Sequence, residues 1–135
     1  TVAATAQRYG FTSSEELRTL TGMASGNAVE NWTSTRDCGS FLSQVYAGTL
    51  VSKNASERMM QLLLGQTRRT KIPAGVPSGV KVANKTGELA AVQNDVAIVF
   101  GTHPYVLAVM SNDISSAVAP SQITELSRAV WDAAQ

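Results

Sequence analysis

The sequence has almost none of the residues that build disulfides and metal clusters. Among 135 residues there is one cysteine, Cys38, and one histidine, His103. A single cysteine excludes an internal disulfide, and a single histidine does not indicate a metal cluster. We expect Cys38 to pack inside a helix rather than to act as a nucleophile, because no positioned base accompanies it, and His103 to lie exposed in a hairpin turn. The sequence predicts no metal and no cofactor.

Long apolar runs and an excess of one charge are also absent. The two longest apolar runs, 96–100 and 105–110, are far shorter than the roughly 20 residues that cross a bilayer. Eleven Lys and Arg against ten Asp and Glu leave a net charge of +1, and the basic residues are scattered. We therefore expect no membrane span and no nucleic-acid partner, and no signal peptide is visible. Aromatic residues are few, and we expect Trp32 and Trp131 to pack rather than to bind a ligand.

The residues that are present predict one domain, or part of one, of the α/β (α+β) class, with a three-stranded antiparallel sheet flanked by helices. Residues 1–34 are typical of the end of a helix followed by a long polar loop. Residues 35–79 predict two helices and a loop with a basic patch at 67–71. Residues 80–112 predict antiparallel strands at 80–85, 95–100 and 105–111, and 120–135 a C-terminal helix.

Capping residues and apolar spacing predict where the helices begin and which faces they bury. Thr35 is expected to cap the first helix, which ends at Gly48, and Asn54 to cap a second, more deeply buried helix that ends at Gly65. Two of the three strands are apolar almost throughout and need cover on both faces, whereas the C-terminal helix covers one. We therefore expect further cover, or further strands, outside this chain. The buried stripe of the C-terminal helix is expected at Ile123, Leu126, Ala129, Val130 and Ala133.

The most informative motif is Asn84-Lys85-Thr86-Gly87-Glu88, at the end of the first strand. Its lysine, threonine and glycine offer a cation, a hydroxyl and a bare backbone, which suit an acyl substrate that carries a carboxylate. Lys85 can hold that carboxylate and lower the proton affinity of a neighbouring hydroxyl, while Thr86 can donate a hydrogen bond to it. Gly87 lets a substrate lie along the strand edge. The alternative is a small independent α/β domain in which the triplet only ends a strand in a turn.

Further motifs stand in a fixed order along the chain. They are Thr33-Ser34-Thr35-Arg36-Asp37, Leu62-Leu63-Leu64-Gly65, Ile72-Pro73-Ala74-Gly75-Val76-Pro77-Ser78-Gly79, Val82-Ala83-Asn84-Lys85-Thr86-Gly87, Asn94-Asp95-Val96-Ala97-Ile98-Val99 and Tyr105-Val106-Leu107-Ala108-Val109-Met110. Their order and spacing resemble the C-terminal half of the serine β-lactamase and penicillin-recognising superfamily, most of all class A β-lactamases and their serine hydrolase relatives. The resemblance covers most of the chain and implies the C-terminal part of the β-lactamase/transpeptidase-like fold.

The resemblance implies roles for the triplet and for two residues after it. Lys85, Thr86 and Gly87 would bind the acyl substrate, and the backbone N–H of Glu88 would complete an oxyanion hole together with the N–H of the nucleophile. Gln93, in the same substrate-binding set, stands where many β-lactamases place an arginine that helps to bind the antibiotic carboxylate. Lys85 and Thr86 would therefore hold that carboxylate without it, and the charge of Glu88 would oppose strong selectivity for β-lactams.

The family's nucleophile motif, Ser-x-x-Lys at the start of a buried helix, has no credible copy here. Ser78-Gly79-Val80-Lys81 fits the letters but is typical of the entry to a strand. Ser25-Gly26-Asn27 fits the family's Ser-x-Asn element, but it lies in the segment that corresponds to the omega loop. We expect neither segment to be catalytic.

The omega-loop segment also departs from the class A pattern. Glu16-Leu17 resembles the family's Glu-Leu pair, but Ser14 falls where the catalytic glutamate would sit, and Arg18 replaces the usual asparagine. Glu15 could take the place of that glutamate only with a shift in register. The resemblance therefore implies slow deacylation.

Two functions follow from these patterns. The first is part of a secreted or envelope-associated bacterial serine hydrolase that acts by acyl transfer on a β-lactam or a peptidoglycan-type peptide, with its nucleophile outside this chain. An N-terminal portion or a second copy of the chain would complete the fold, and this chain alone would have no turnover. The second is a non-catalytic module that binds cell-wall peptides or a partner chain, favoured by the missing Ser-x-x-Lys, by Ser14 and by Gln93.

Overall fold

Three β-branched runs form the central sheet of the computed structural model, which describes residues 1–17 and 30–135. The sheet is antiparallel in the order β1-β2-β3, with β1 at Lys81–Leu89, β2 at Val92–Phe100 and β3 at Tyr105–Val109. This confirms the predicted three-stranded sheet. β1 runs past its predicted end at Lys85, because residues 90–91 alone turn the chain into β2. The triplet therefore lies within a strand and not at its end.

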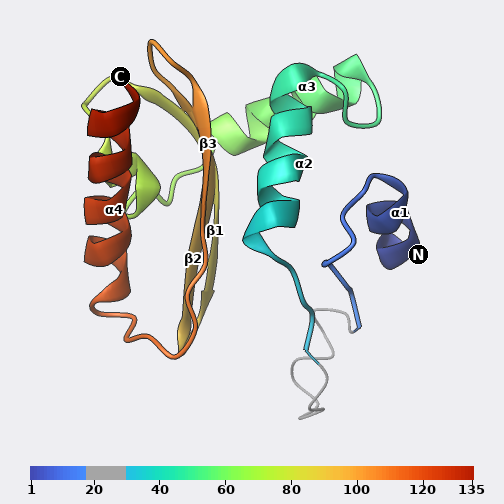
Figure 1. Ribbon diagram of the computed structural model, residues 1–135, viewed down its shortest axis with the longest axis horizontal. Helices are drawn as coiled ribbons and strands as arrows, with labels where there is room; N and C mark the ends of the chain where they lie inside the picture. Colours follow the sequence, from blue (N-terminus) through green and yellow to red (C-terminus); the bar gives the residue numbers. More distant parts are fainter. Residues whose placement is uncertain (18–29) are drawn as a thin grey trace.

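Helices lie on both faces of this sheet (Figure 1). One face is covered by α4, Ala119–Ala134, and the short 3-10 helix η2, Ile72–Gly75; the other is covered by α2, Thr35–Ala47, and α3, Lys53–Leu64. Because side chains alternate along β1, Val82 and Ala83 join different apolar clusters. The cluster under α4 consists of Ile72, Val82, Ala97, Val99 and Ile123, and the cluster under α2 of Phe11, Leu42, Val45, Leu50, Ala83 and Ile98. The expectation that the second face depends on cover from outside this chain is wrong, because α2 and α3 provide that cover.

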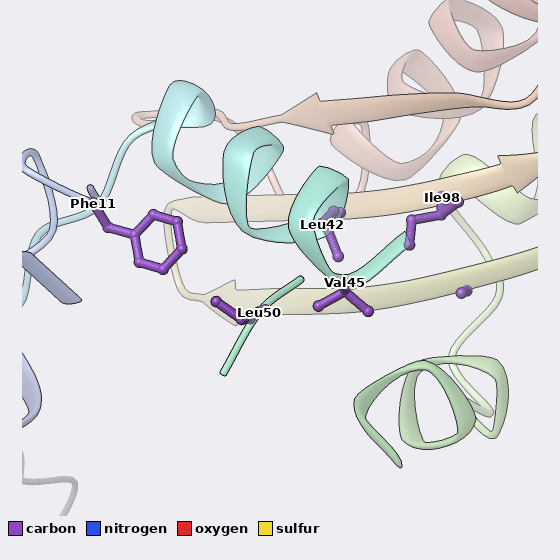
Figure 2. Packing of buried hydrophobic residues seen from close by; sticks show 6 residues of the cluster. Phe11, Leu42, Val45, Leu50 and Ile98 are labelled. Atoms are coloured by element: carbon purple, nitrogen blue, oxygen red, sulfur yellow. The ribbon is translucent and has the colours of Figure 1, made fainter. Parts of the chain in front are cut away.

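The cluster under α2 joins apolar residues from distant parts of the sequence. Figure 2 shows Leu42 and Val45 of α2 together with Ile98 of β2, and Phe11 arriving from the segment that follows α1, Val2–Arg8. Leu42, Val45 and Ile98 are at most 2% exposed. Because burial of such a side chain contributes about 1.5–3 kcal/mol, this cluster holds α2 against the sheet.

Serine caps start two helices slightly earlier than predicted. Ser34, and not Thr35, caps α2, since its Oγ accepts a hydrogen bond at 3.1 Å from the N–H three residues on. Ser52, and not Asn54, caps α3 in the same way, also at 3.1 Å. The serine hydroxyl satisfies an N–H that the first turn of a helix leaves without a partner. The predicted ends, at Gly48 for α2 and Gly65 for α3, are confirmed.

α3 is less buried than predicted. Ser56 is its only buried residue, and Leu62 is 78% exposed, because much of the helix faces away from the sheet. The expectation of a deeply buried second helix is therefore wrong. α4, with 16 residues, is the longest helix described, and none of the helices in the described residues has both the length and the apolar character of a membrane span.

α4 packs on η2 through a polar residue that the apolar pattern missed. Ser127 is fully buried, and its Oγ donates a hydrogen bond to the carbonyl of Ile72 at 2.9 Å. A small, satisfied hydroxyl can be buried where two helices approach closely. The expected stripe is right at Ile123, which is buried. It is wrong at Leu126, Ala129 and Ala133, which are exposed.

An apolar groove of about 600 Å³ opens between α1, α2 and α3. No residue of α1 is buried, and Val51, which lines the groove, is 62% exposed. The groove is lined by Thr1, Val2, Thr5, Ala6, Tyr9, Phe11, Phe41, Leu50, Val51 and Met59.

The two tryptophans differ in burial. Trp32 is 66% exposed, so the expectation that it packs is wrong, whereas Trp131 packs against the cluster under α4 as expected.

Candidate functional site

The triplet lies on β1, an edge strand of the sheet. Among the described residues β1 pairs only with β2, so the other edge of β1 carries no strand. An extended substrate can add to such an edge through backbone hydrogen bonds. Lys85 is exposed there, and its Nζ donates to the carbonyl of Thr86. The structure thus presents the predicted cation at a strand edge that is open to a ligand.

The residues of the triplet point to opposite faces of the sheet, because side chains alternate along a strand. Lys85 and Gly87 lie on the α2 face with Ala83, and Thr86 and Glu88 lie on the η2 face with Val82. Thr86 is 7% exposed. Of the two polar side chains in the triplet, Lys85 is therefore the accessible one, and the hydrogen bond from Thr86 to a carboxylate stays a prediction.

The fold itself does not require a glycine at position 87. Among residues 1–17 and 30–135, a Cβ at Gly87 would meet only the side chain of Asn94, at 3.6 Å from its Cβ and 3.8 Å from its Nδ2, which are ordinary contact distances. Packing within this part of the chain thus leaves room for a larger residue. The bare backbone at Gly87 is consistent with the close approach of something outside the chain, as predicted from the motif.

A buried lysine lies behind the triplet. Lys71 is 1% exposed, and its Nζ donates to Glu88 Oε1 at 3.0 Å and to the carbonyl of Asn94 at 3.2 Å. Arg68 Nη1 donates to the other oxygen of Glu88, Oε2, at 2.8 Å. The predicted basic patch at 67–71 is therefore wrong for Lys71, which is an interior residue that joins β1 to β2. No local sequence pattern predicted the ion pair between Lys71 and Glu88, because the two residues are far apart in the chain.

These contacts favour the ionised form of Glu88. The hydrogen bond from Lys71 is the main cause that holds the pKa of Glu88 below its usual range. Burial opposes this effect, and the positive charges of Lys71, Arg68 and Lys85 add to it. Glu88 is thus a carboxylate held in ion pairs on the η2 face, which weakens its expected opposition to an anionic ligand.

A second carboxylate, that of Asp95, lies close enough to Lys71 to feel its charge. Asp95 is fully buried; its Oδ2 accepts from the N–H of Ile72 and its Oδ1 from Asn84 Nδ2, both at 3.0 Å. Burial raises the pKa of Asp95, while these hydrogen bonds and the charge of Lys71 oppose the rise. Asn84 also donates to the carbonyl of Arg68 at 3.2 Å. Asn84, the residue before Lys85, therefore links β1 by hydrogen bonds to β2 and to the segment before η2.

Gln93 is placed opposite Glu88 in the strand register, but its side chain faces the turn. It is 6% exposed, and its Nε2 donates to the carbonyl of Leu89 at 3.3 Å. Its backbone is held by Ser111, whose Oγ accepts from the Gln93 N–H at 3.3 Å. The structure thus brings Gln93 near the triplet and engages its amide in holding the β1–β2 turn. Its part in substrate binding stays a prediction.

Ser14 belongs to a separate cluster at the start of α2. Its Oγ donates to Asp37 Oδ2 at 2.8 Å and lies 2.9 Å from Thr33 Oγ1. The N–H of Ser13 donates to the same oxygen of Asp37 at 2.8 Å, and Asp37 is 5% exposed. Ser14 is thus a structural partner of Asp37, and a serine hydroxyl in this position offers no general base. Glu15 and Glu16 are exposed.

The other sequence candidates are located as follows. Ser78 lies in an exposed turn and Lys81 is the first residue of β1, which confirms that Ser78-Gly79-Val80-Lys81 is a strand entry. Cys38 is half-buried in α2, with its Sγ 3.5 Å from Thr33 Oγ1. His103 is exposed between β2 and β3, as predicted. Arg18 and Ser25-Gly26-Asn27 lie outside the described residues.

Comparison with known proteins gives a family match over nearly the whole chain. The model of the Beta-lactamase enzyme family (Beta-lactamase2) matches residues 1–134. A search of curated proteins finds no match.

Solved structures of the same fold are about twice as long as this chain. PBP-A is 25% identical, with a TM-score of 0.83, over 96% of this chain and 49% of its own. A PBP-A mutant in an acyl-enzyme complex with penicillin G is 24% identical over the same shares, also with a TM-score of 0.83. A β-lactamase from Sphaerobacter thermophilus is 25% identical, with a TM-score of 0.87, over 98% of this chain and 52% of its own. The chain spans about half the length of these proteins.

The match to the family model and the shared fold agree with the order of the motifs and with the strand that carries Lys85-Thr86-Gly87. On this evidence the chain belongs to the Beta-lactamase enzyme family.

Proposed function

We propose that this chain supplies the substrate-binding side of a serine hydrolase that acts by acyl transfer on a β-lactam or a peptidoglycan-type peptide. The observation that carries the proposal is the open edge of β1, which presents the exposed Lys85 next to Gly87. The nucleophilic serine and its lysine base, in a Ser-x-x-Lys motif, come from residues outside this chain. No cofactor takes part.

Each residue of the triplet has a role in that reaction. The serine Oγ gives its proton to the lysine base and attacks the carbonyl carbon of the substrate amide, and negative charge develops on the carbonyl oxygen. The C–N bond then breaks, and the nitrogen leaves as an amine with that proton. The backbone N–H of Glu88 donates to that oxygen, a contribution typically worth about 3–4 kcal/mol in the transition state. Lys85 holds the substrate carboxylate, with Thr86 as a second donor and Gly87 leaving room for the substrate backbone.

The acyl-enzyme is expected to be long-lived. Hydrolysis of an acyl-enzyme needs a base that activates water, and the hydroxyl of Ser14, engaged with Asp37, is not such a base. A PBP-A mutant of the same fold has been solved as an acyl-enzyme with penicillin G. We therefore propose acylation followed by slow deacylation. The family likeness also supports our proposal that the protein is secreted or lies in the bacterial envelope.

The groove beside α1 supports a contribution from outside this chain. It is lined mostly by apolar side chains, and no residue of α1 is buried. An exposed apolar groove often marks a site where further protein packs, because covering it removes apolar surface from water. We propose that the portion carrying Ser-x-x-Lys packs here, as an N-terminal part of the same protein, and a second copy of the chain is the alternative. Without the portion that carries Ser-x-x-Lys, this chain should not turn over substrate.

The test is intact-mass spectrometry of the longest natural polypeptide that contains this chain, after incubation with a fluorescent penicillin. We expect a stable adduct of one penicillin. Lys85→Ala should slow its formation at least tenfold, and Lys81→Ala, which removes an exposed lysine from the same face of the same strand, should not. Equal rates in both variants would contradict the role of Lys85.

A second function is favoured by Ser14 and by the absence of a credible Ser-x-x-Lys in this sequence. It is a non-catalytic module that binds cell-wall peptides along the edge of β1. No adduct in the mass measurement, together with peptide binding that Lys85→Ala weakens, would assign this function in place of acyl transfer.

A further inference from the structure

Lys71 differs from the lysines at the surface in both burial and contacts. Its side chain is 1% exposed, whereas Lys81 and Lys85 are exposed. Removing an ammonium group from water is costly unless the group is paired and hydrogen-bonded. Lys71 meets this condition with Glu88 Oε1 at 3.0 Å and the carbonyl of Asn94 at 3.2 Å. Its partners are therefore the reason that it can be buried here.

Both partners of Lys71 lie beside the triplet. Glu88 directly follows Gly87 on β1, and Asn94 is the residue opposite Gly87 on β2. The ammonium group therefore holds the two strands together at the end of the triplet. Because the carboxylate of Glu88 is fixed on the η2 face, the orientation of its peptide unit, which carries the proposed oxyanion donor, is fixed as well.

The pair also determines the charge that a ligand meets. Lys85 lies three residues before Glu88, and its charge contributes to the lowered pKa of Glu88, so the two groups interact electrostatically. This interaction is reciprocal: a Glu88 carboxylate without partners would lower the positive potential at Lys85. Lys71 and Arg68 supply two positive charges to that one carboxylate, at 3.0 and 2.8 Å. Lys85 is thereby left as a cation for a ligand.

We propose that Lys71 is a positioning residue for the substrate edge of β1: it neutralises Glu88 so that Lys85 can select an anionic acyl substrate, and it fixes the peptide unit of Glu88. The preference for a carboxylate rests on the proposed function, whereas the effect of Lys71 on the potential at Lys85 does not. Arg68 is a lesser contributor, because its side chain is 67% exposed and its ion pair is screened by solvent.

The potential at Lys85 can be measured without any activity. In the longest natural polypeptide, Lys85→Cys introduces a thiol probe after Cys38 and any other cysteine have been replaced by serine. The pKa of the probe thiol is then read from thiolate absorbance. Lys71→Met should raise it by about half a unit, and Lys71→Met with Glu88→Gln should restore it. Lys71→Arg should leave it unchanged.

Two variants control this titration. Lys81→Met removes a lysine about 13 Å along the strand, beyond the Debye length at physiological salt, and should leave the pKa of the probe unchanged. Glu88→Gln alone should lower it, which keeps the test valid if Lys71→Met does not fold. A probe pKa that does not respond to Lys71→Met in a folded protein, or to Glu88→Gln, overturns the proposal.

A second measurement tests selectivity with Lys85 in place. The rate of adduct formation is compared for penicillin G, which is anionic, and its neutral methyl ester. Lys71→Met should lower the ratio of the two rates at least threefold, and the double variant should restore it. A merely structural role would slow both substrates equally and overturn the proposal. Failure of the wild-type protein to form an adduct contradicts the proposed acyl transfer instead, and the thiol titration still decides the role of Lys71.

Discussion

The two faces of the sheet are packed in different ways. Under η2 and α4, Ile72, Val99 and Ser127 have no exposed surface, and the hydroxyl of Ser127 donates to the carbonyl of Ile72 at 2.9 Å. Beside α1, at the outer end of the α2 face, a groove of about 600 Å³ stays open and Val51 is 62% exposed. Figure 1 shows α4 lying flat along the sheet, whereas α1 stands beyond α2 on the side away from the strands.

This difference shows which surfaces are complete within the chain. On the η2 face, Lys71, Asp95 and Ser127 all find hydrogen-bond partners within this chain. On the α2 face, the groove and the exposed side of the triplet lie where further protein or a ligand can add. We infer that substitutions in the packing between η2 and α4 act mainly on stability, and those on the α2 face mainly on binding.

The largest effect is expected at the ion pair between the buried Lys71 and Glu88, whose side chain is 32% exposed. Glu88→Ala leaves the ammonium of Lys71 buried without its carboxylate, and we expect the free energy of unfolding to fall by about 3–5 kcal/mol. Lys71→Met places an apolar side chain in the same space, while Glu88 keeps Arg68 and its contact with water. That variant should lose about 1 kcal/mol or less. Urea unfolding of both proteins measures the difference.

The critical result is the difference between the losses of stability in Glu88→Ala and in Lys71→Met. Equal losses in Glu88→Ala and Lys71→Met would show that the cost comes from the broken pair and not from the stranded buried charge. Glu88→Gln is the matched control, because its amide oxygen can still accept from Lys71. It should fall between the two.

A smaller effect is expected at Gly75, where η2 packs on α4. A Cβ at this position would lie 2.5 Å from the carbonyl oxygen of Thr124 and 2.6 Å from Ser127 Cβ, so the two helices would have to separate. Gly75→Ala should therefore cost about 1–3 kcal/mol. Denaturant unfolding measures this loss, and an unchanged midpoint would contradict the close packing of this face.

Gly87→Ala is the matched substitution on the other face. Its Cβ would meet Asn94 at no less than 3.6 Å, so stability should change by less than about 0.5 kcal/mol. Adduct formation with penicillin should nevertheless slow about tenfold, because the methyl group occupies the edge proposed for the substrate. A large loss of stability, or an unchanged rate of adduct formation, would remove the distinction between the two glycines.

Local sequence patterns predicted the order of the elements well. The strands are alternating or continuous runs of β-branched residues, and glycines end α2 and α3, so each signal lies within a few residues of its effect. The start of α3 was missed because Ser52 and Asn54 are both good caps, and the local sequence does not distinguish between the two.

The candidate site was predictable in its chemistry and not in its surroundings. The residue types of the triplet predict a cation and a bare backbone. Which of its side chains lie on which face of the sheet depends on the pairing of β1 with β2. Lys71 was predicted to belong to a basic patch because its sequence neighbours are basic. Its burial depends on Glu88 and Asn94, which only the folded sheet brings to it. Non-local pairing of this kind leaves no periodic signal in the sequence.

The smallest effect is expected at Val51, on the rim of the groove. Its φ of 64° is in the left-handed region, which is unfavourable for a β-branched residue. Val51→Asn should stabilise the protein by about 1 kcal/mol or less, because asparagine tolerates this conformation. Val51→Ala, which keeps an ordinary Cβ there, should gain less, and urea unfolding compares the two. A gain in Val51→Asn means that the rim at Val51 stays open to solvent even where further protein fills the groove, whereas a loss in both variants means that the covering portion reaches Val51.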